Sequence, residues 1–570
     1  MQQFLSKLST KSPWFWLALG LVTVYISGLF IDVMDVDASQ YASISMEMLQ
    51  NGSWLQVQHR GVDYLDKPPL LFWLSTSSFS LFGLYNWAYK LPSLLAALAG
   101  VYGINRFTLI YYTPRIARHA AFLLASAIGL IVICNDVRTD TLLLGTSTCA
   151  VWQLAEYLEK NKWKYLIGGF FFIGLAMLAK GPIGLVISGF GIGTHLLLTG
   201  QWRQIFKWQW IVGLLVSAIV LAPMCWGLWQ QFDLHPEKTV NDKTGVSGLY
   251  FFFWEQSFGR ITGENVWRND ASAFYFIHVY LWAFLPWCLM LYLAFMEQLF
   301  KIRIKVKETW KRKEYISIGA FLLSFAALSA SKYKLPHYIF ITLPWAAVLL
   351  ASYLNKIEET RQKMLRQWMV FYLSAGLGII IAFLLPGFVF PTKNILIWVL
   401  MIVPLALLGW QVIKNPVPGD TDMLIQRGVF VSIFLGLVLN LFFYPRLLPY
   451  QSSRPIAEYA RKNNIPADKM ANFRRSSHAL DFYNQDILEG FSDAEYVQKN
   501  ANENGIFYIE TDGVGREDLI NDGVNLETLE GFNNFKVALL NTRFLNPARR
   551  SSALDTIYLL KILPSPVSAE

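Results

Sequence analysis

The chain has 570 residues, of which 54% are hydrophobic, 15% aromatic and only 16% charged. Soluble domains average about 25% charged residues, so this composition excludes an ordinary soluble protein and indicates a membrane protein. The formal net charge is +9. No basic stripe interleaved with aromatic residues lies in a soluble segment, which argues against binding to nucleic acid.

Apolar runs recur from residue 14 to about residue 445, and each is close to the roughly 20 residues that a helix needs to cross a bilayer. We therefore predict a polytopic α-helical membrane protein with about thirteen transmembrane helices. The expected spans lie near 13–31, 88–111, 118–134, 140–158, 163–179, 182–199, 208–228, 273–297, 315–331, 337–354, 368–389, 394–413 and 427–445.

The distribution of basic residues predicts the orientation of these spans. Every second connection is basic, among them Arg115–Arg118 and Lys301–Lys313. The positive-inside rule therefore places the N-terminus in the cytoplasm and the long loops 32–87 and 229–272 outside. We interpret the cytoplasmic clusters as solvated topology signals. A cleaved signal peptide is the alternative for the first span, but its length favours a retained helix.

Three outer segments are expected to have defined roles. Residues 38–50 have apolar residues at helical spacing and are followed by Asn51-Gly52, which predicts an amphipathic helix at the membrane interface. Residues 70–84 are apolar but short, which favours a re-entrant or interfacial helix. The 229–272 loop is long, and loops of that length often act as functional lids.

The composition becomes polar after residue 445. We predict two domains, a transmembrane domain at 1–445 and a small external α/β domain at 446–570. In the second domain, residues 478–483 are expected to be helical, and strand-like runs lie at 505–510, 535–540 and 557–562.

Two carboxylates near the outer ends of spans are candidate catalytic groups. Asp37 precedes the helix predicted at 38–50, where it could accept a proton as a general base or could simply cap the helix, and its position alone favours capping. Asp32 and Asp35 are nearby rivals for the catalytic role. Asp140 follows a short outer turn in which charges are costly unless they are paired or exposed. We interpret Asp136 and Arg138 as a structural pair, which leaves Asp140 facing a cavity.

Several outer cations break the positive-inside rule. Lys67 precedes two prolines that restrict the backbone and aim its side chain, although it could instead snorkel to the interface. Lys180, in a short outer turn, either snorkels or binds an anion. The other candidate binding and supporting residues are Tyr64 and Asp66 beside Lys67, Lys332, Lys334, His337 and Tyr338 in a third turn, and Glu255 and Arg260 in the long loop.

A group of cations on the outer face requires an anion, and at this depth the available anion is a lipid phosphate. A polyprenyl-phosphate-linked sugar fits this requirement. Its tail would stay between the spans while its headgroup reaches Asp37 and Asp140.

The same residues carry a resemblance to a known family. Their motifs resemble those of the integral-membrane, lipid-phosphate-sugar-dependent glycosyltransferases with the GT-C fold. Within them, the chain resembles the bacterial branch of the protein O-mannosyltransferase family, which includes the lipid A aminoarabinose transferase. The resemblance covers about residues 10–450. It rests on Asp37-Ala-Ser-Gln-Tyr-Ala, Glu47-Met48, Tyr64-Leu-Asp-Lys-Pro-Pro-Leu, Arg138-Thr-Asp, Ala179-Lys-Gly-Pro, Phe253-Trp-Glu through Gly259-Arg260, and Lys334-Leu-Pro-His-Tyr.

The resemblance implies that Asp37 is the catalytic carboxylate, that Asp140 supports it, and that Lys67 and Tyr338 hold the carrier phosphate. The thirteen predicted spans and the external C-terminal domain agree with the aminoarabinose-transferase branch, and the resemblance implies a location in the bacterial inner membrane. The chain departs from the family pattern at a few positions, which leaves the sugar and the acceptor open. Ala38 and Asp66 replace Glu, Gln40 replaces Arg, and the histidine expected around Arg268–Asn269 is not evident.

We therefore expect an inverting glycosyltransferase. It would move a sugar, such as 4-amino-4-deoxy-L-arabinose, from undecaprenyl phosphate to lipid A or another envelope acceptor on the periplasmic face. Asp37 would act as general base or orient the acceptor, while the cations stabilise the departing phosphate. No cofactor is expected, because the cations let the phosphate leave, and a divalent metal is left open.

Three alternatives remain at this stage. One is a protein O-mannosyltransferase-like enzyme, which differs only in the acceptor and sugar. Another is a lipid-linked-sugar flippase or transporter, but the candidate charges gather at one interface rather than at the midplane depth typical of transporters. The third is an assembly protein whose external domain docks a partner.

Overall fold

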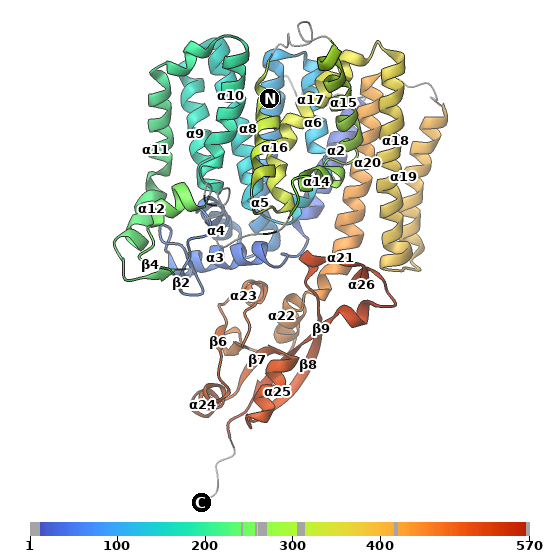
Figure 1. Ribbon diagram of the computed structural model, residues 1–570. Helices are drawn as coiled ribbons and strands as arrows, with labels where there is room; N and C mark the ends of the chain where they lie inside the picture. Colours follow the sequence, from blue (N-terminus) through green and yellow to red (C-terminus); the bar gives the residue numbers. More distant parts are fainter. Residues whose placement is uncertain are drawn as a thin grey trace, which may run out of the picture.

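The computed structural model describes residues 12–240, 243–256, 259, 269, 271–304, 314–414 and 420–565. Figure 1 shows a bundle of upright helices with a smaller lobe, built from C-terminal residues, below one end of it. We call this end of the bundle the domain end and the opposite end the far end.

A helix occupies the position of every predicted span. Eleven of these positions hold a single α-helix: α2 (Pro13–Leu29), α5 (Asn86–Tyr111), α8 (Thr139–Lys160), α9 (Trp163–Lys180), α10 (Ile183–Leu198), α11 (Gln209–Leu228), α16 (Ile316–Ala330), α17 (Leu343–Ile357), α18 (Arg361–Leu384), α19 (Ile395–Lys414) and α20 (Thr421–Val438).

The remaining two predicted spans are broken. The 118–134 span consists of α6 (Pro114–Ala125) and α7 (Ile128–Asn135), which are bent by 48°. The 273–297 span is divided into α14 (Tyr275–Ala283) and α15 (Cys288–Ile304). Seven of the described helical segments are long and apolar enough to cross a membrane, or eight if the α6–α7 pair is one span. The number thirteen therefore stays a prediction.

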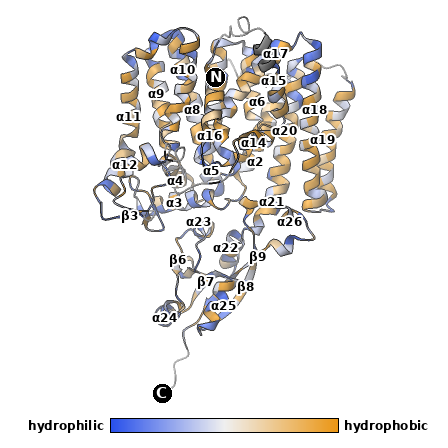
Figure 2. Cartoon of the chain, in the orientation of Figure 1, coloured by the Kyte–Doolittle hydropathy of each residue, from blue (hydrophilic) through white to orange (hydrophobic). Residues whose placement is uncertain are grey.

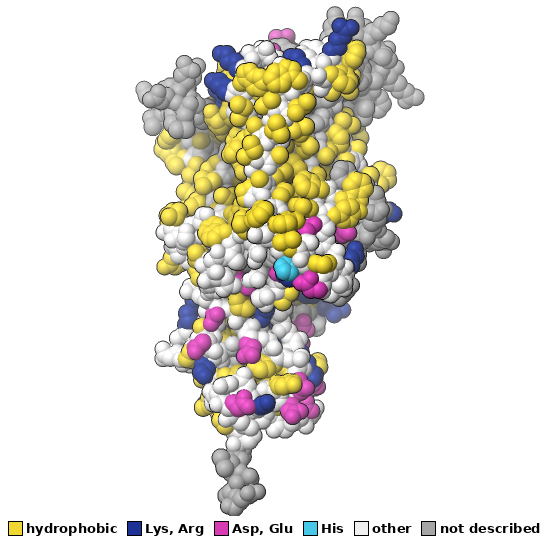
Figure 3. Space-filling model, turned by 90° about the vertical axis from the view of Figure 1, so that its left-hand side faces the viewer, with side chains coloured by type: hydrophobic (Ala, Val, Ile, Leu, Met, Phe, Trp, Pro, Cys, Tyr) yellow, Lys and Arg dark blue, Asp and Glu magenta, His cyan; other side chains and the backbone are white. Residues whose placement is uncertain are grey.

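The surface of the bundle suits a lipid environment. Apolar residues dominate the upright helices, whereas the lobe is mixed (Figure 2). One face of the bundle is covered by a broad apolar band (Figure 3). Helices satisfy their own backbone hydrogen bonds, so an apolar exterior of this kind is stable in hydrocarbon.

Helix α3 (Asp37–Asn51) lies across the domain end (Figure 1). The helix predicted at 38–50 is confirmed, and Gly52 ends it with a φ of 67°, which glycine adopts without strain. Its polar face does not meet water as an interfacial helix would require, since Ser39, Ser43 and Glu47 are buried. One flank packs on α4 (Leu70–Phe82), the short helix predicted at 70–84, and another packs on the lobe.

The described part of the 229–272 loop is largely folded. Asp233 accepts hydrogen bonds from Ser247 Oγ at 2.5 Å and from the Gly248 N–H at 3.0 Å, so it holds the two sides of the loop together. Whether the loop acts as a lid stays a prediction. Its elements are η2 (Trp229–Asp233), β3 (Thr239–Val240), β4 (Lys243–Thr244), α12 (Gly248–Tyr250) and η3 (Phe251–Glu255).

The lobe contains a five-stranded sheet of order β6-β5-β7-β9-β8. Strand β5 is parallel to β6 and β7, and β9 is antiparallel to β7 and β8. The strands are β5 (Met470–Phe473), β6 (Glu489–Phe491), β7 (Phe507–Asp512), β8 (Leu526–Asn534) and β9 (Asp555–Ile562). The helices are α22 (Ser453–Lys462), α23 (His478–Asn484), α24 (Ala494–Asn504), α25 (Gly513–Asn521) and α26 (Thr542–Leu545).

The local predictions for the lobe are partly confirmed. The helix at 478–483 and the strands at 505–510 and 557–562 are present. The strand predicted at 535–540 is wrong, because Phe535 stacks on Phe544 at 4.0 Å and the chain turns away from the sheet. Residues 421–450 form a continuous helical segment. The boundary predicted between 445 and 446 falls inside it, and the division into two domains stays a prediction.

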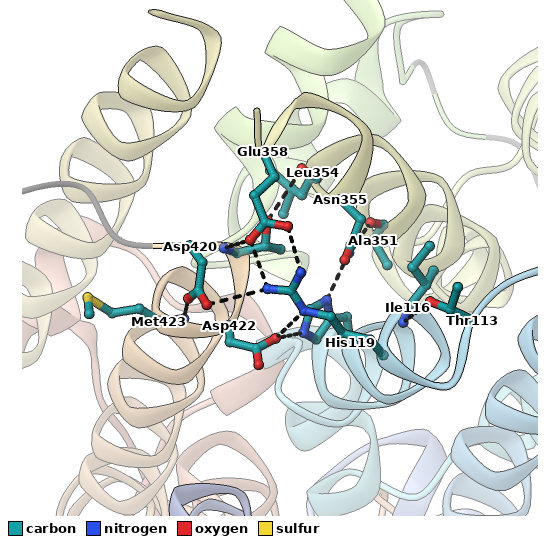
Figure 4. A network of polar contacts seen from close by, with 12 residues as sticks. Thr113, Ile116, His119, Ala351, Leu354, Asn355, Glu358, Asp420, Asp422 and Met423 are labelled. Atoms are coloured by element: carbon teal, nitrogen blue, oxygen red, sulfur yellow. Dashed lines mark hydrogen bonds and ion pairs between the residues drawn. The ribbon is translucent and has the colours of Figure 1, made fainter. Parts of the chain in front are cut away.

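A network of ion pairs joins three helices at the far end (Figure 4). Arg115 of α6 contacts Glu358 at 2.6 Å and Asp422 at 2.9 Å. His119, fully buried on the same helix, lies 2.5 Å from Asp422. The Arg115–Arg118 cluster is therefore not only a solvated topology signal, since its charges connect α6 to α17 and α20.

Candidate active site

Asp37 lies at the domain end beside Arg138. The Arg138 guanidinium donates hydrogen bonds to the Asp37 carboxylate and to Asp136 Oδ2 at 3.0 Å. Its side chain is 12% exposed, whereas Asp37 keeps 40% of its own exposure. The predicted Asp136–Arg138 pair is confirmed, but it extends to Asp37. The capping alternative is wrong, because α3 begins at Asp37 and no side-chain capping bond occurs at this described helix start.

Asp140 lies in a second ionic cluster, formed by three separate elements. Lys180 Nζ, at the end of α9, lies 2.5 Å from Asp140 Oδ1. His337 Nε2 is 3.7 Å from Asp140 Oδ2, and Lys180 Nζ lies 3.9 Å from the centre of the Tyr338 ring. Because Asp140 is only 2% exposed, its charge requires a cation beside it, which Lys180 provides.

Local sequence explains how the cations reach these positions. Lys180 is the last residue of α9, and Gly181, with a φ of 79°, turns the chain directly into α10. Lys180 therefore stands at the tip of a tight helical hairpin. Lys67 is followed by Pro68 and Pro69, which lead into α4. The positive charge of Lys67 is close enough to His337 to act electrostatically on its imidazole ring.

A cavity of about 220 Å³ opens beside the Asp140 cluster. Its polar end is formed by Lys67, Asp140, Lys180 and Tyr338. The expectation that Asp140 faces a cavity is confirmed. The remaining wall is mostly apolar and comes from α8, α10, α16 and the segment before α17. It includes Leu143, Ile183, Val186, Ile187, Phe190, Leu328 and Ile341.

Tyr64 lies in a smaller adjoining cleft. That cleft shares Lys67 and Gln256 with the cavity. Tyr64 packs edge-on against Phe72 at 5.9 Å. Asp66 lies two residues after Tyr64 in the chain, and its backbone carbonyl accepts a hydrogen bond from Gln256 Nε2 at 2.5 Å. The Tyr64–Lys67 segment is thereby fastened to the 229–272 loop.

The structure does not bring every predicted residue to the cavity. Lys334 Nζ donates to the Ala271 carbonyl at 3.0 Å. Lys332 is exposed, and Glu255 lies 3.7 Å from Lys243 Nζ. None of Lys332, Lys334 and Glu255 is among the described residues that line the cavity. Arg260 lies outside the described residues, as does Arg268.

Two residues of the site were not among the predicted ones. Gln256 lines both cavities, and its only sequence signal is its place within the motif that runs from Phe253 through Arg260. Tyr41 is 3% exposed and lies in the first-loop motif. Burial raises the pKa of the Tyr41 hydroxyl well above its usual range, and the neighbouring Tyr64 and Asp37 act in the same direction. Among the described residues, no group of three or more His, Cys, Asp or Glu could hold a metal ion.

The chain is similar in sequence to several known proteins. Residues 66–229 match the family model for dolichyl-phosphate-mannose-protein mannosyltransferase. The chain is 26% identical over 388 residues to the undecaprenyl phosphate-alpha-4-amino-4-deoxy-L-arabinose arabinosyl transferase of Edwardsiella ictaluri, a match that spans 65% of each protein. It is 23% identical over 496 residues to the corresponding transferase 1 of Pseudomonas fluorescens, over 83% of this chain and 82% of that protein.

A solved structure has the same fold. The crystal structure of ArnT from Cupriavidus metallidurans bound to undecaprenyl phosphate superposes with a TM-score of 0.73 and 18% sequence identity, over 96% of this chain and 97% of that one. The apolar helices and this match define a multi-pass helical membrane protein with the fold of ArnT. In sequence and fold, the chain is similar to the ArnT-like glycosyltransferases.

Proposed function

We propose that this protein transfers a sugar from undecaprenyl phosphate to lipid A, and that the sugar is 4-amino-4-deoxy-L-arabinose. The observation that carries the proposal is the cavity, which has a cationic end at Lys67 and Lys180 and an apolar wall along the spans. A phosphate with a hydrocarbon tail matches both parts. The names of the relatives, which specify an undecaprenyl phosphate-linked aminoarabinose, support this choice of donor.

We assign the leaving phosphate to the cations of the cavity. During transfer an acceptor oxygen attacks the anomeric carbon, and the bond to the phosphate oxygen breaks with its electron pair going to the phosphate. Negative charge therefore grows on the phosphate in the transition state. Fixed cations such as Lys67 and Lys180 stabilise that charge more than they stabilise the ground state, which accelerates the reaction. Asp140 holds Lys180 in place through the contact of 2.5 Å.

Asp37 is assigned to the acceptor side of the reaction. A hydroxyl acceptor must lose its proton, and Asp37 would take it as general base. A phosphate acceptor is largely ionised at neutral pH, so no proton needs to be removed. Asp37 would then stabilise positive charge at the anomeric carbon. Its contact with Arg138 orients the carboxylate in either case.

We place the site on the periplasmic face of the inner membrane. The basic connections, such as Arg115–Arg118 and Arg203–Lys207, follow the far ends of α5 and α10. The positive-inside rule assigns that end to the cytoplasm. The N-terminus is then cytoplasmic, and Asp37, the cavity and the C-terminal lobe are periplasmic.

The test is transfer by the purified protein in vesicles. Labelled undecaprenyl-phosphate aminoarabinose is mixed with lipid A, and mass spectrometry of the lipids follows the sugar. We expect the donor to be consumed and lipid A to gain one aminoarabinose. Movement of the donor across the bilayer without any acceptor would identify a flippase instead. Transfer to a protein but not to lipid A would favour the mannosyltransferase-like alternative.

A further inference from the structure

The hairpin β1–β2 (Gln58–His59 and Val62–Asp63) is fastened to α3 through its turn. Arg60 and Gly61 form the turn with φ values of 55° and 73°, as a two-residue hairpin of this twist requires. Both turn N–H groups donate to the Glu47 carboxylate, Arg60 at 2.6 Å and Gly61 at 2.8 Å. Glu47 belongs to α3 and is 4% exposed. The hairpin and α3 therefore form one unit.

The side chain of Arg60 connects this unit to the C-terminal lobe. Its Nη1 donates to Asp481 Oδ2 at 2.7 Å, and its Nη2 donates to the Leu488 carbonyl at 2.5 Å. Asp481 is fully buried and also accepts the Leu488 N–H at 3.1 Å. A guanidinium that binds two groups at once restricts orientation as well as distance. Arg60 thus joins α3, the hairpin and the lobe.

The lobe also forms hydrogen bonds with Val33 and Asp35, which precede Asp37 in the chain. Gln451 donates to the Val33 carbonyl at 3.2 Å and accepts the Asp35 N–H at 3.0 Å. Tyr483 accepts the Val33 N–H at 2.8 Å. These bonds lie two to four residues before Asp37. The two chain segments that carry Asp37 and Lys67 are therefore both attached to the same lobe.

We propose that the C-terminal lobe positions the active site, and that Arg60 is the positioning residue through which it acts on the hairpin side. The inference rests on the proposed function, because it concerns the alignment of Asp37 with the phosphate site at Lys67. Arg60 lies four residues before Tyr64 and seven before Lys67 in sequence. Displacements of about 1 Å can cost about 100-fold in rate when reacting groups must meet in one geometry.

The test replaces Arg60 without disturbing the turn. Arg60→Gly keeps the positive φ and the N–H that binds Glu47, and it removes the side chain with its guanidinium. Asp481→Asn removes the charge on the other side. Arg474→Ala is the matched control, because Arg474 pairs with Asp518 within the lobe and is 46% exposed. Transfer kinetics are measured per folded molecule in vesicles, together with hydrogen exchange of residues 58–63.

We expect Arg60→Gly to lower kcat by about 10- to 100-fold, with a smaller change in KM for the donor. Arg60→Lys should recover part of the loss, because one ammonium does not replace a fork that binds two groups. The double variant Arg60→Gly/Asp481→Asn should be no worse than Arg60→Gly alone, since both remove the same link. Residues 58–63 should exchange faster in Arg60→Gly but not in Arg474→Ala.

The outcomes separate the inference from the proposed function. If the wild type transfers no sugar, the proposed function fails, while hydrogen exchange still tests the link. If the wild type is active and Arg60→Gly matches Arg474→Ala in kcat, the inference is overturned. It is also overturned if Arg60→Gly is fully active when purified but inactive in cells, because the lobe would then dock a partner. Asp481→Asn provides the same comparison if Arg60→Gly does not fold.

Discussion

Arg138 balances the negative charge of Asp37, the candidate general base, and that of its neighbour Asp136. It contacts both Asp37 and Asp136 while it is mostly shielded from water. A second cation, Lys180, balances the negative charge of the buried Asp140. The two carboxylates thus differ in environment, since Asp37 keeps 40% of its side-chain exposure and Asp140 keeps 2%. We therefore propose that Asp37 acts on the acceptor side of the reaction and that Asp140 has a supporting role.

Replacing Asp37 tests the first assignment. Asp37→Asn keeps the size of the side chain and removes the base, so we expect turnover to fall by about 10²- to 10⁴-fold. The measurement is aminoarabinose transfer in reconstituted vesicles, with Asp522→Asn, an exposed lobe position, as control. Intact turnover by Asp37→Asn at normal folding would remove Asp37 from the mechanism.

A comparison of Lys180 with Lys334 tests the proposed phosphate site more sharply, because the sequence alone makes both lysines candidate binding residues. Lys180 lines the cavity, whereas the Lys334 ammonium donates to the Ala271 carbonyl. Charge-assisted bonds to phosphate are worth about 1.5–3 kcal/mol, so Lys180→Ala should weaken donor use by about 10- to 100-fold. Lys334→Ala should mainly lower thermal stability. Equal losses of donor affinity in the two variants would contradict the placement of the phosphate.

Close helix packing positions the site at the scale of elements. Helix α8 carries Asp140 at its start and packs against α5 through small residues. A Cβ at Gly145 would lie 2.1 Å from the Ala96 carbonyl oxygen of α5. Small residues let helices in membranes approach this closely. The depth and angle of Asp140 therefore depend on a glycine that lies more than one helical turn away.

We expect Gly145→Ala to separate α5 from α8 and to lower both the unfolding temperature and the transfer rate. Overpacking of this kind costs about 1–3 kcal/mol. Gly193→Ala is the control, because nothing lies within 4 Å of a Cβ there. That control should be neutral or slightly stabilising, since alanine favours helix by about 1 kcal/mol. Similar thermal scans of the two variants would show that the α5–α8 contact is not limiting.

Buried ionisable groups make the stability of the whole molecule depend on pH. Burial raises the pKa of Asp481 to about 7 against the opposing effect of Arg60, and it raises the pKa of Glu510 to about 7 against that of Arg475. Burial also lowers the pKa of His59 to about 3 and that of His478 to about 4. The other charged groups that act on these carboxylates are Asp35, Glu47 and Asp486.

The signs of these shifts predict a stability maximum. A raised carboxyl pKa favours the folded state increasingly as the pH falls through about 7. The lowered histidine pKa values act oppositely, because the unfolded histidines take up protons below about 6.5. We expect the unfolding temperature to rise from pH 8 to about 6.5 and then to level off or fall. The rise in unfolding temperature between pH 8 and about 6.5 should be smaller in Asp481→Asn. The opposing effect below about pH 6.5 should be smaller in His478→Gln. Thermal scans at several pH values would show both changes.

Local sequence properties determined the helices and most of the site. Hydropathy and length depend on neighbouring residues, so the positions of the helices, including α3 and α4, were predicted correctly. Motif spacing also identified Asp140, Lys67 and Lys180, because each lies at a turn whose place follows from the spans on either side. Proline and glycine next to the lysines constrain the local backbone. For these features no information from distant parts of the chain is needed.

Only the tertiary structure decided which side chains meet. Lys334 and Lys180 have similar local patterns, yet one binds a loop carbonyl and the other binds Asp140. One flank of α3 packs against a lobe more than 400 residues away in sequence, and Arg60 of the neighbouring hairpin binds Asp481 in that lobe. Burial, ion pairing and shifted pKa values arise from packing between such distant segments. Sequence periodicity therefore specifies each helix, whereas the neighbours of its charged residues are set by how the helices and the lobe pack.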